Sequence, residues 1–235
     1  MGLAFFWGAI AASSLVLGAI LALSIRIRER LLGSIMAFGS GVLVAAVAYE
    51  LVLEAAEAAA RTGAVASGMF AGALTFYYGD ALIEHAGRSE QNEGSAFAIA
   101  LGTVLDGIPE SIVLGLTLLQ GKGSIAMLAA VFISNVPEAI ASTTGLAASG
   151  WSRRRILILW TLVLLASAFA AMAGFAFLEN ASDFIVAFIL SFAGGAILTM
   201  LAQTMMLEAG SLAGHTVGLV TTFGFAVGYA LHLIE

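Results

Sequence analysis

The sequence contains two prolines, and each stands directly before a glutamate inside a long apolar run. The first lies in the segment Asp106-Gly-Ile-Pro-Glu110 and the second in Ser134-Asn-Val-Pro-Glu138. Proline has no N–H, so within a helix it leaves the carbonyl four residues earlier without its donor. In hydrocarbon, a carboxylate and a bare carbonyl are both costly unless something satisfies them. The pattern therefore predicts two membrane helices with polar breaks.

The rest of the chain is equally apolar. Of 235 residues, 61% are hydrophobic and 10% charged, and the mean hydropathy is +1.04. Soluble domains carry about 25% charged residues, so we expect an integral, multi-pass protein of the plasma or inner membrane. No polar stretch is long enough for a soluble domain, and residues 1–235 are predicted to form a single transmembrane domain. Cysteine is absent, which excludes disulfides and thiolate ligands.

Apolar runs of about 20 residues are long enough to cross a bilayer as helices. The sequence predicts an all-α fold with eight such helices, at residues 4–25, 33–59, 64–85, 95–120, 123–148, 154–178, 182–208 and 213–234. The weakest boundaries lie at 59–64 and 120–124, where a single basic residue is the clearest break. Seven helices is the main competing count.

Basic residues predict the orientation, because arginine and lysine collect in cytoplasmic loops. Seven of the nine bases lie in the first, third and fifth loops: Arg26, Arg28, Arg30, Arg88, Arg153, Arg154 and Arg155. The even-numbered loops contain only Arg61 and Lys122. We therefore expect the odd-numbered loops in the cytoplasm and both termini outside.

An internal repeat relates the second and seventh predicted helices. The segment from Gly41 to Ala55 aligns without gaps on the segment from Gly195 to Ala209, and Phe38 aligns with Phe192 at the same offset. Five helices apart, the two copies cross the membrane in opposite directions. We expect an inverted repeat of helices 1–3 and 6–8 around helices 4 and 5, as in many secondary transporters. A chance match between two Ala/Leu-rich helices is the alternative.

The two proline segments concentrate oxygen ligands. Asp106 and Glu110 are four residues apart and about 40° apart around a helix axis, so they share a face. Asn135 and Glu138 are three residues apart and also share one, with Ser134 a turn before Glu138. Facing each other, the two helices bring together carboxylates, an amide and a hydroxyl. Such a set suits a hard or borderline divalent cation.

Charge supports the same interpretation. Every arginine and lysine lies at a predicted helix end, so no base is expected near midplane to pair with these acids. Clustered carboxylates in low dielectric are either protonated or neutralised by a cation that enters. A protonated cluster with a packing role is the structural alternative, although intramembrane acids are functional by default. Glu50 and Gln203, deep in the second and seventh helices, extend the set as a further ligand or part of a proton exit.

These residues resemble the ZIP family of divalent metal transporters. That family has eight helices, both termini outside, and metal ligands in paired His-Asn-x-Pro-Glu-Gly-like motifs on its fourth and fifth helices. Here the matching segments are Leu105-Asp-Gly-Ile-Pro-Glu110 and Ser134-Asn-Val-Pro-Glu-Ala139. By layout the resemblance covers nearly the whole chain, whereas the specific motifs cover two short stretches.

The resemblance implies a role for each motif position. Glu110 and Glu138 match the family's two glutamates, Asp106 stands in place of a histidine, Ser134 in place of a histidine or glutamine, Asn135 in place of an asparagine or aspartate, and Gln203 in place of an acidic ligand. With Glu50, these residues are the candidate metal ligands. Gly107 offers no side chain where the family often has asparagine.

The family implies Zn²⁺ as substrate, a homodimer, and an elevator-like or rocking motion of the helices around the site. Both motif histidines are missing here, and an all-oxygen set raises Mn²⁺, Fe²⁺ or Cd²⁺ as substrates. We expect a divergent member that moves a transition-metal cation toward the cytoplasm, with protons as a further partner and no nucleic acid.

Two other classes compete. A proton- or monovalent-cation-coupled carrier of another substrate would use the same carboxylates. An intramembrane aspartyl enzyme would need a partner for Asp106, and Asp80 lies near a helix end without a second Gly-rich Asp motif. We therefore expect no enzymatic activity.

Overall fold

The computed structural model describes residues 1–59, 62–88, 102, 107–118 and 124–234. Within these ranges the chain is helical and contains no strand, which confirms the all-α class. Among the described residues, five segments are long and apolar enough to cross a membrane: Gly2–Ser24, Glu29–Ala58, Ile125–Ala148, Arg153–Leu178 and Asp183–Leu233. The chain is therefore a multi-pass helical membrane protein.

The helices follow the predicted segments to within a few residues, except that the predicted helix at 95–120 lies largely outside the described residues. Their bounds are α1 (Gly2–Ser24), α2 (Glu29–Ala46), α3 (Glu54–Ala58), α4 (Ala64–Arg88), a helix at Gly107–Leu118, α6 (Ile125–Ala148), α7 (Arg153–Leu178), α8 (Asp183–Met200), α9 (Met206–Ala213) and α10 (Val217–Leu233). A short 3-10 turn, Gly214–Thr216, separates α9 from α10.

Local sequence explains where several helices begin and end. Ser124, Ser152 and Ser182 are the N-caps of α6, α7 and α8, and each side chain accepts a hydrogen bond from a first-turn amide. These bonds satisfy donors that a helix start leaves free. Gly150 and Gly214 follow α6 and α9 with φ of 86° and 66°, a backbone conformation that favours glycine.

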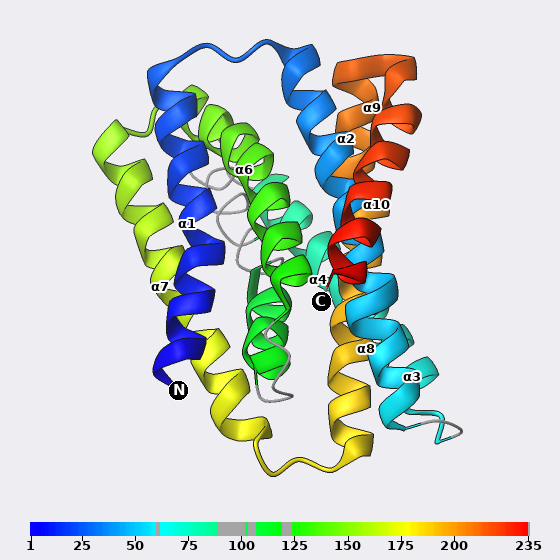
Figure 1. Ribbon diagram of the computed structural model, residues 1–235. Helices are drawn as coiled ribbons and strands as arrows, with labels where there is room; N and C mark the ends of the chain where they lie inside the picture. Colours follow the sequence, from blue (N-terminus) through cyan, green and yellow to red (C-terminus); the bar gives the residue numbers. More distant parts are fainter. Residues whose placement is uncertain (60–61, 89–101, 103–106, 119–123, 235) are drawn as a thin grey trace.

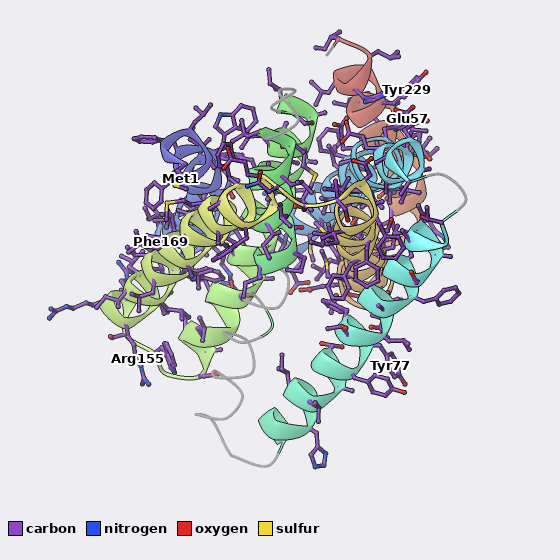
Figure 2. The ribbon with its side chains drawn as sticks, turned by 90° about the horizontal axis from the view of Figure 1, so that it is seen from below. Met1, Glu57, Tyr77, Arg155, Phe169 and Tyr229 are labelled. Atoms are coloured by element: carbon purple, nitrogen blue, oxygen red, sulfur yellow. The ribbon has the colours of Figure 1, made fainter. Side chains whose placement is uncertain are left out.

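The helices form two bundles (Figure 1). α1, α6 and α7 make one, and α2, α3, α4, α8, α9 and α10 make the other. Viewed from below, Met1 and Phe169 lie in the first bundle, whereas Glu57, Tyr77 and Tyr229 lie in the second (Figure 2). The division places a boundary between bundles along α6 and α2, which contact each other.

The first bundle has its own core. Leu15 of α1, Leu146 of α6 and Trp160 of α7 are buried there, and the Trp160 indole N–H donates to the Thr143 hydroxyl at 2.8 Å. The helix Gly107–Leu118 packs on α7, because Gly174 of α7 lies directly against the Ile112 backbone. A buried indole N–H needs a hydrogen-bond acceptor, so the bond from Trp160 to Thr143 fixes α7 against α6.

A larger buried cluster spans both bundles. It includes Leu114 of the helix Gly107–Leu118, Met127 of α6, Leu43 of α2 and Leu190 of α8. The two bundles therefore meet through apolar side chains as well as through the polar residues described below.

Large apolar side chains also cover the outside. Phe70, Phe177 and Leu219 are 72%, 84% and 79% exposed. A contiguous apolar exterior is unfavourable in water but is the surface that lipid requires. The exterior thus agrees with membrane-spanning helices.

Two helices contain π-helical segments at positions that the sequence repeat aligns. Val47–Leu53 joins α2 to α3, and Leu201–Met205 joins α8 to α9. Val47 and Leu201 are separated by the same offset as Gly41 and Gly195. π-Helical turns are rare and occur frequently at functional sites.

Close approaches between backbones follow the same offset. A Cβ added to Gly41 of α2 would overlap the Thr221 carbonyl of α10, and one added to Gly195 of α8 would overlap the Met69 carbonyl of α4. The second helix therefore packs on α10 in the way that the seventh packs on α4.

A second pair of contacts repeats the arrangement in reverse. A Cβ at Gly224 of α10 would overlap the Phe38 carbonyl, and one at Gly72 of α4 would overlap the Phe192 carbonyl. Phe38 and Phe192 are themselves aligned by the repeat. Small residues at these crossings let the helices pack closely, as is common in membranes.

Candidate functional site

Glu110 lies at the start of the helix Gly107–Leu118 and is 1% exposed. The neighbouring Ser111 hydroxyl donates to the Gly107 carbonyl at 2.7 Å, and Val113 and Leu114, one turn further on, are fully buried. Asp106, the other predicted ligand of this segment, lies outside the described residues. The structure thus confirms that an acidic side chain is buried beside Pro109.

The second motif lies in the middle of α6. Ser134 and Asn135 are 2% and 6% exposed, and Glu138 is half-buried. Pro137 is inside the helix, so the Ile133 carbonyl lacks its intrahelical donor. The Ser134 hydroxyl donates to the Val131 carbonyl at 3.1 Å and keeps its lone pairs for a ligand.

The second bundle approaches α6 at the same level. A Cβ built on Gly39 of α2 would lie 3.2 Å from the Ser134 Cα and 3.2 Å from the Met205 methyl of the π segment. The Ile133 carbonyl oxygen is 3.6 Å from the same point. Because residue 39 is glycine, the two bundles can meet beside the Ile133 carbonyl, which Pro137 leaves without a donor.

Gln203 belongs to the π segment that contains Met205. Its Oε1 is buried and has no hydrogen-bond partner among the described residues. Nearly all buried polar atoms in proteins have a partner, so an unpaired carbonyl oxygen requires an explanation. A bound cation would supply one.

Glu50 lies in the other π segment and is 5% exposed. Its Oε1 is 2.7 Å from Nδ1 of His232 near the end of α10, and the His232 ring stacks on Tyr49 with centroids 5.0 Å apart. The sequence analysis selected Glu50 and gave no role to His232. Because 182 positions separate the two, no local pattern connected them. Among the described residues, Glu50 therefore has a polar contact with His232 and with none of the other candidate ligands.

Among the described residues, acidic and imidazole groups alone do not form a metal site. In the part of the chain that the structure describes, no group of three or more His, Cys, Asp and Glu side chains could hold a metal ion. A cation bound by Glu110 or Glu138 would therefore need further oxygen ligands, and Ser134, Asn135 and Gln203 offer a hydroxyl and two amides.

A hollow of about 1110 Å³ lies between the two bundles at the end where the α1–α2 loop crosses from one to the other (Figure 1). Ile140, Ala141 and Thr144 of α6 line it on one side, and Glu208 and Leu212 of α9 on the other. Ala141 is three residues after Glu138 and shares its helix face. The hollow therefore extends along α6 toward Glu138.

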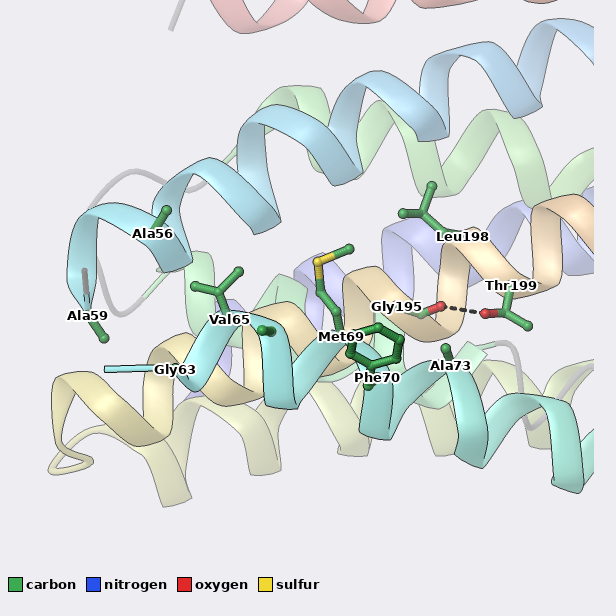
Figure 3. A pocket seen from close by; sticks show the side chains of 11 residues that line it. Ala56, Ala59, Gly63, Val65, Met69, Phe70, Ala73, Gly195, Leu198 and Thr199 are labelled. Carbon is green, nitrogen blue, oxygen red and sulfur yellow. Dashed lines mark hydrogen bonds between the residues drawn. The ribbon is translucent and has the colours of Figure 1, made fainter. Parts of the chain in front are cut away.

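A second pocket, of about 740 Å³, is formed by α3, α4 and α8 (Figure 3). Apolar side chains such as Val65, Met69 and Leu198 line it, and its Thr199 hydroxyl donates to the Gly195 carbonyl at 2.8 Å. None of the candidate ligands lines this pocket, and its apolar wall offers nothing to a cation.

The fold and the buried polar residues define the class of this protein. It is a multi-pass helical membrane protein in two bundles, with polar side chains buried where the bundles meet. No protein-family model matches the chain, and no curated protein sequence matches it.

Proposed function

We propose that this protein is a divalent metal ion transporter that moves Zn²⁺, Mn²⁺, Fe²⁺ or a similar cation toward the cytoplasm. The observation that carries the proposal is the burial of Glu110, Ser134 and Asn135 on proline-containing helices, with Ser134 at the place where α2 approaches α6. Carboxylate, hydroxyl and amide oxygens are expensive to bury in a membrane, and a divalent cation offsets that cost by accepting their lone pairs.

Six of the seven candidate ligands, all except Glu50, have a role in the proposed site. Glu110 and Glu138 supply negative charge, Ser134 and Asn135 supply neutral oxygens from α6, and Asp106 completes the first bundle's contribution. The buried Gln203 oxygen, without a partner among the described residues, supplies a ligand from the second bundle. A site divided between two bundles loses a ligand when they separate, which favours release.

We infer eight spans arranged as an inverted repeat. Three observations support the inference: the aligned π segments, the Gly41 and Gly195 approaches, and the reciprocal approaches at Phe38 and Phe192. In this arrangement α4, the helix Gly107–Leu118 and α10 are spans in addition to the long helices. The layout is that of the ZIP family, and we propose a divergent member.

Transport follows from motion of one bundle past the other. The hollow beside α6 gives water access from the α1–α2 side, which the arginines predict to be cytoplasmic. A shift that closes this hollow and opens the opposite end would alternate access to the buried oxygens. A homodimer, as the family resemblance implies, would hold the second bundle still.

Metal uptake into proteoliposomes tests the proposal. The assay compares Zn²⁺, Mn²⁺, Fe²⁺ and Cd²⁺, with and without a pH gradient, in wild type, Glu110→Gln and Glu138→Gln. Glu57→Gln is the matched control, because Glu57 is an exposed carboxylate near the end of α3. We expect uptake in wild type and E57Q and none in E110Q or E138Q. Equal uptake in all four proteins would exclude this site.

A second candidate function is a proton-coupled carrier of another substrate, and the Glu50–His232 contact favours it. A buried carboxylate bonded to a partly exposed imidazole is a route for protons between water and the interior. Proton flux that requires Glu50 and His232, in liposomes free of divalent metal, would favour this function over metal transport.

A further inference from the structure

The α1–α2 loop and the first turn of α2 carry a cluster of positive charge at the rim of the hollow between the bundles. Arg26, Arg28 and Arg30 all line this hollow, and all three are exposed. The other side of the hollow belongs to α6 and α9, so the loop lies over the boundary between bundles. A ligand bound here would touch both.

The wall of the hollow is amphipathic. Leu23, Ile27 and Leu32 from the loop region and Ile140 and Leu212 from the facing helices line it together with the three arginines. An inorganic anion would use the guanidinium groups and leave this aliphatic wall without a contact. A phospholipid has an anionic headgroup and apolar chains, and it matches both parts of the lining.

The guanidinium groups are available to such a ligand. Glu29 and Glu208 line the same hollow, but neither forms an ion pair with the three arginines among the described residues. Each guanidinium offers five donors in a planar fork that fits phosphate oxygens. The membrane interface, where the spans of α1 and α2 end, is where lipid headgroups lie.

We propose that this hollow binds an anionic phospholipid, with its phosphate on Arg26, Arg28 and Arg30 and its chains against the aliphatic wall. Bound there, the lipid bridges the two bundles and stabilises the arrangement in which the hollow is open. This inference concerns a lipid site and stands whether or not the cargo is a metal.

The test uses the full chain in phosphatidylcholine nanodiscs with an increasing fraction of phosphatidylglycerol. Wild type is compared with R26Q/R28Q and with R153Q/R154Q, which removes two arginines that are also exposed, at the start of α7 on the same predicted side. Thermal stability and the number of lipids retained in native mass spectrometry are measured. Two arginines near an anionic surface contribute enough for about a tenfold shift in half-saturating lipid.

We expect R26Q/R28Q to need about tenfold more phosphatidylglycerol than wild type, R153Q/R154Q to behave as wild type, and R26K/R28K to recover part of the effect. Equal shifts in both glutamine variants would reduce the effect to general surface charge and overturn the proposal. Stabilisation of wild type by inorganic phosphate as strong as by lipid would also overturn it.

A second measurement does not depend on how the arginine variants fold. The chain has no cysteine, so an environment-sensitive fluorophore on I27C reports on the hollow alone. Its emission should change on titration with phosphatidylglycerol and not with phosphatidylcholine. An equal response to the two lipids contradicts an anion-selective site.

Discussion

Ser134 and Asn135 are consecutive polar residues of α6, and both side chains are buried. Packing of an apolar core does not require polar groups at these positions. Two polar side chains in the middle of a membrane helix cost stability unless a partner uses them. The Ser134 hydroxyl donates to the Val131 carbonyl of the same helix, and its oxygen can still accept. Together with Glu110, they are the buried polar residues on which the proposed cation site depends.

Replacing Asn135 with leucine separates function from packing. A buried amide exchanged for an apolar side chain of similar size has little effect on stability. We expect N135L to remain folded and to lose metal uptake by about tenfold or more, the value of one strong ligand contact. Ser40→Ala, which removes a buried hydroxyl bonded to Met36 outside the site, should transport normally. Uptake at the wild-type rate in N135L contradicts the assignment.

Glu50 and His232 form a polar contact between the π segment and the last helix. Replacing Glu50 with glutamine exchanges the carboxyl group beside the imidazole for an amide, which weakens this buried hydrogen bond by about 1 kcal/mol. We expect E50Q to unfold at a lower temperature than wild type in detergent, followed by circular dichroism. Exposed Glu57, replaced in the same way, should cause no change. Equal melting of E50Q and E57Q would show that the contact contributes nothing.

At the scale of elements, the fold depends on glycines that let helices cross closely. The second and seventh helices each place a glycine against the backbone of a partner, α10 in one case and α4 in the other. In both helices a π-helical segment lies between two α-helical segments, and the two π segments begin at positions that the repeat aligns. The sequence repeat predicted that these helices are related, whereas the choice of partner required the tertiary arrangement.

A leucine at Gly195 or Gly41 would force two backbones apart. Overpacking of this kind costs about 1–3 kcal/mol, and we expect G195L and G41L to lower the melting temperature by similar amounts. Gly210 is the matched control: it lies in α9 with nothing within 4 Å of an added Cβ, so G210A should be neutral or stabilising by up to about 1 kcal/mol. A leucine tolerated at only one of the two positions argues against a repeat in structure.

At the scale of the whole molecule, the two bundles and the hollow between them suggest relative motion. Thr144 and Leu212 line the hollow from opposite bundles, so a flexible bifunctional reagent joining T144C to L212C should lock them. We expect cross-linking to stop uptake and reduction of a cleavable linker to restore it. Phe5 and Phe169, which contact each other within the first bundle, give the control pair F5C/F169C, and its cross-linking should be harmless. Undiminished uptake in locked T144C/L212C would exclude bundle motion.

Topology is testable by labelling single cysteines, because the native chain has none. Eight spans require R28C and G150C to react with an impermeant reagent from one side and G63C and A181C from the other. The positive loops predict that the first pair faces the cytoplasm. Labelling of R28C and G150C from opposite sides would mean that an odd number of the four crossings between them is missing.

The sequence by itself determined the membrane class, the all-helical fold, the approximate helix bounds and the burial of Glu110, Ser134 and Asn135. Hydropathy and the proline–glutamate pairs are local signals, and they act on each helix separately. Tertiary structure alone decided that Glu50 meets His232, that the helices divide into two bundles, and that a hollow lined by Arg26, Arg28 and Arg30 lies between them. These features depend on contacts between segments far apart in the chain, which no local pattern of residues records.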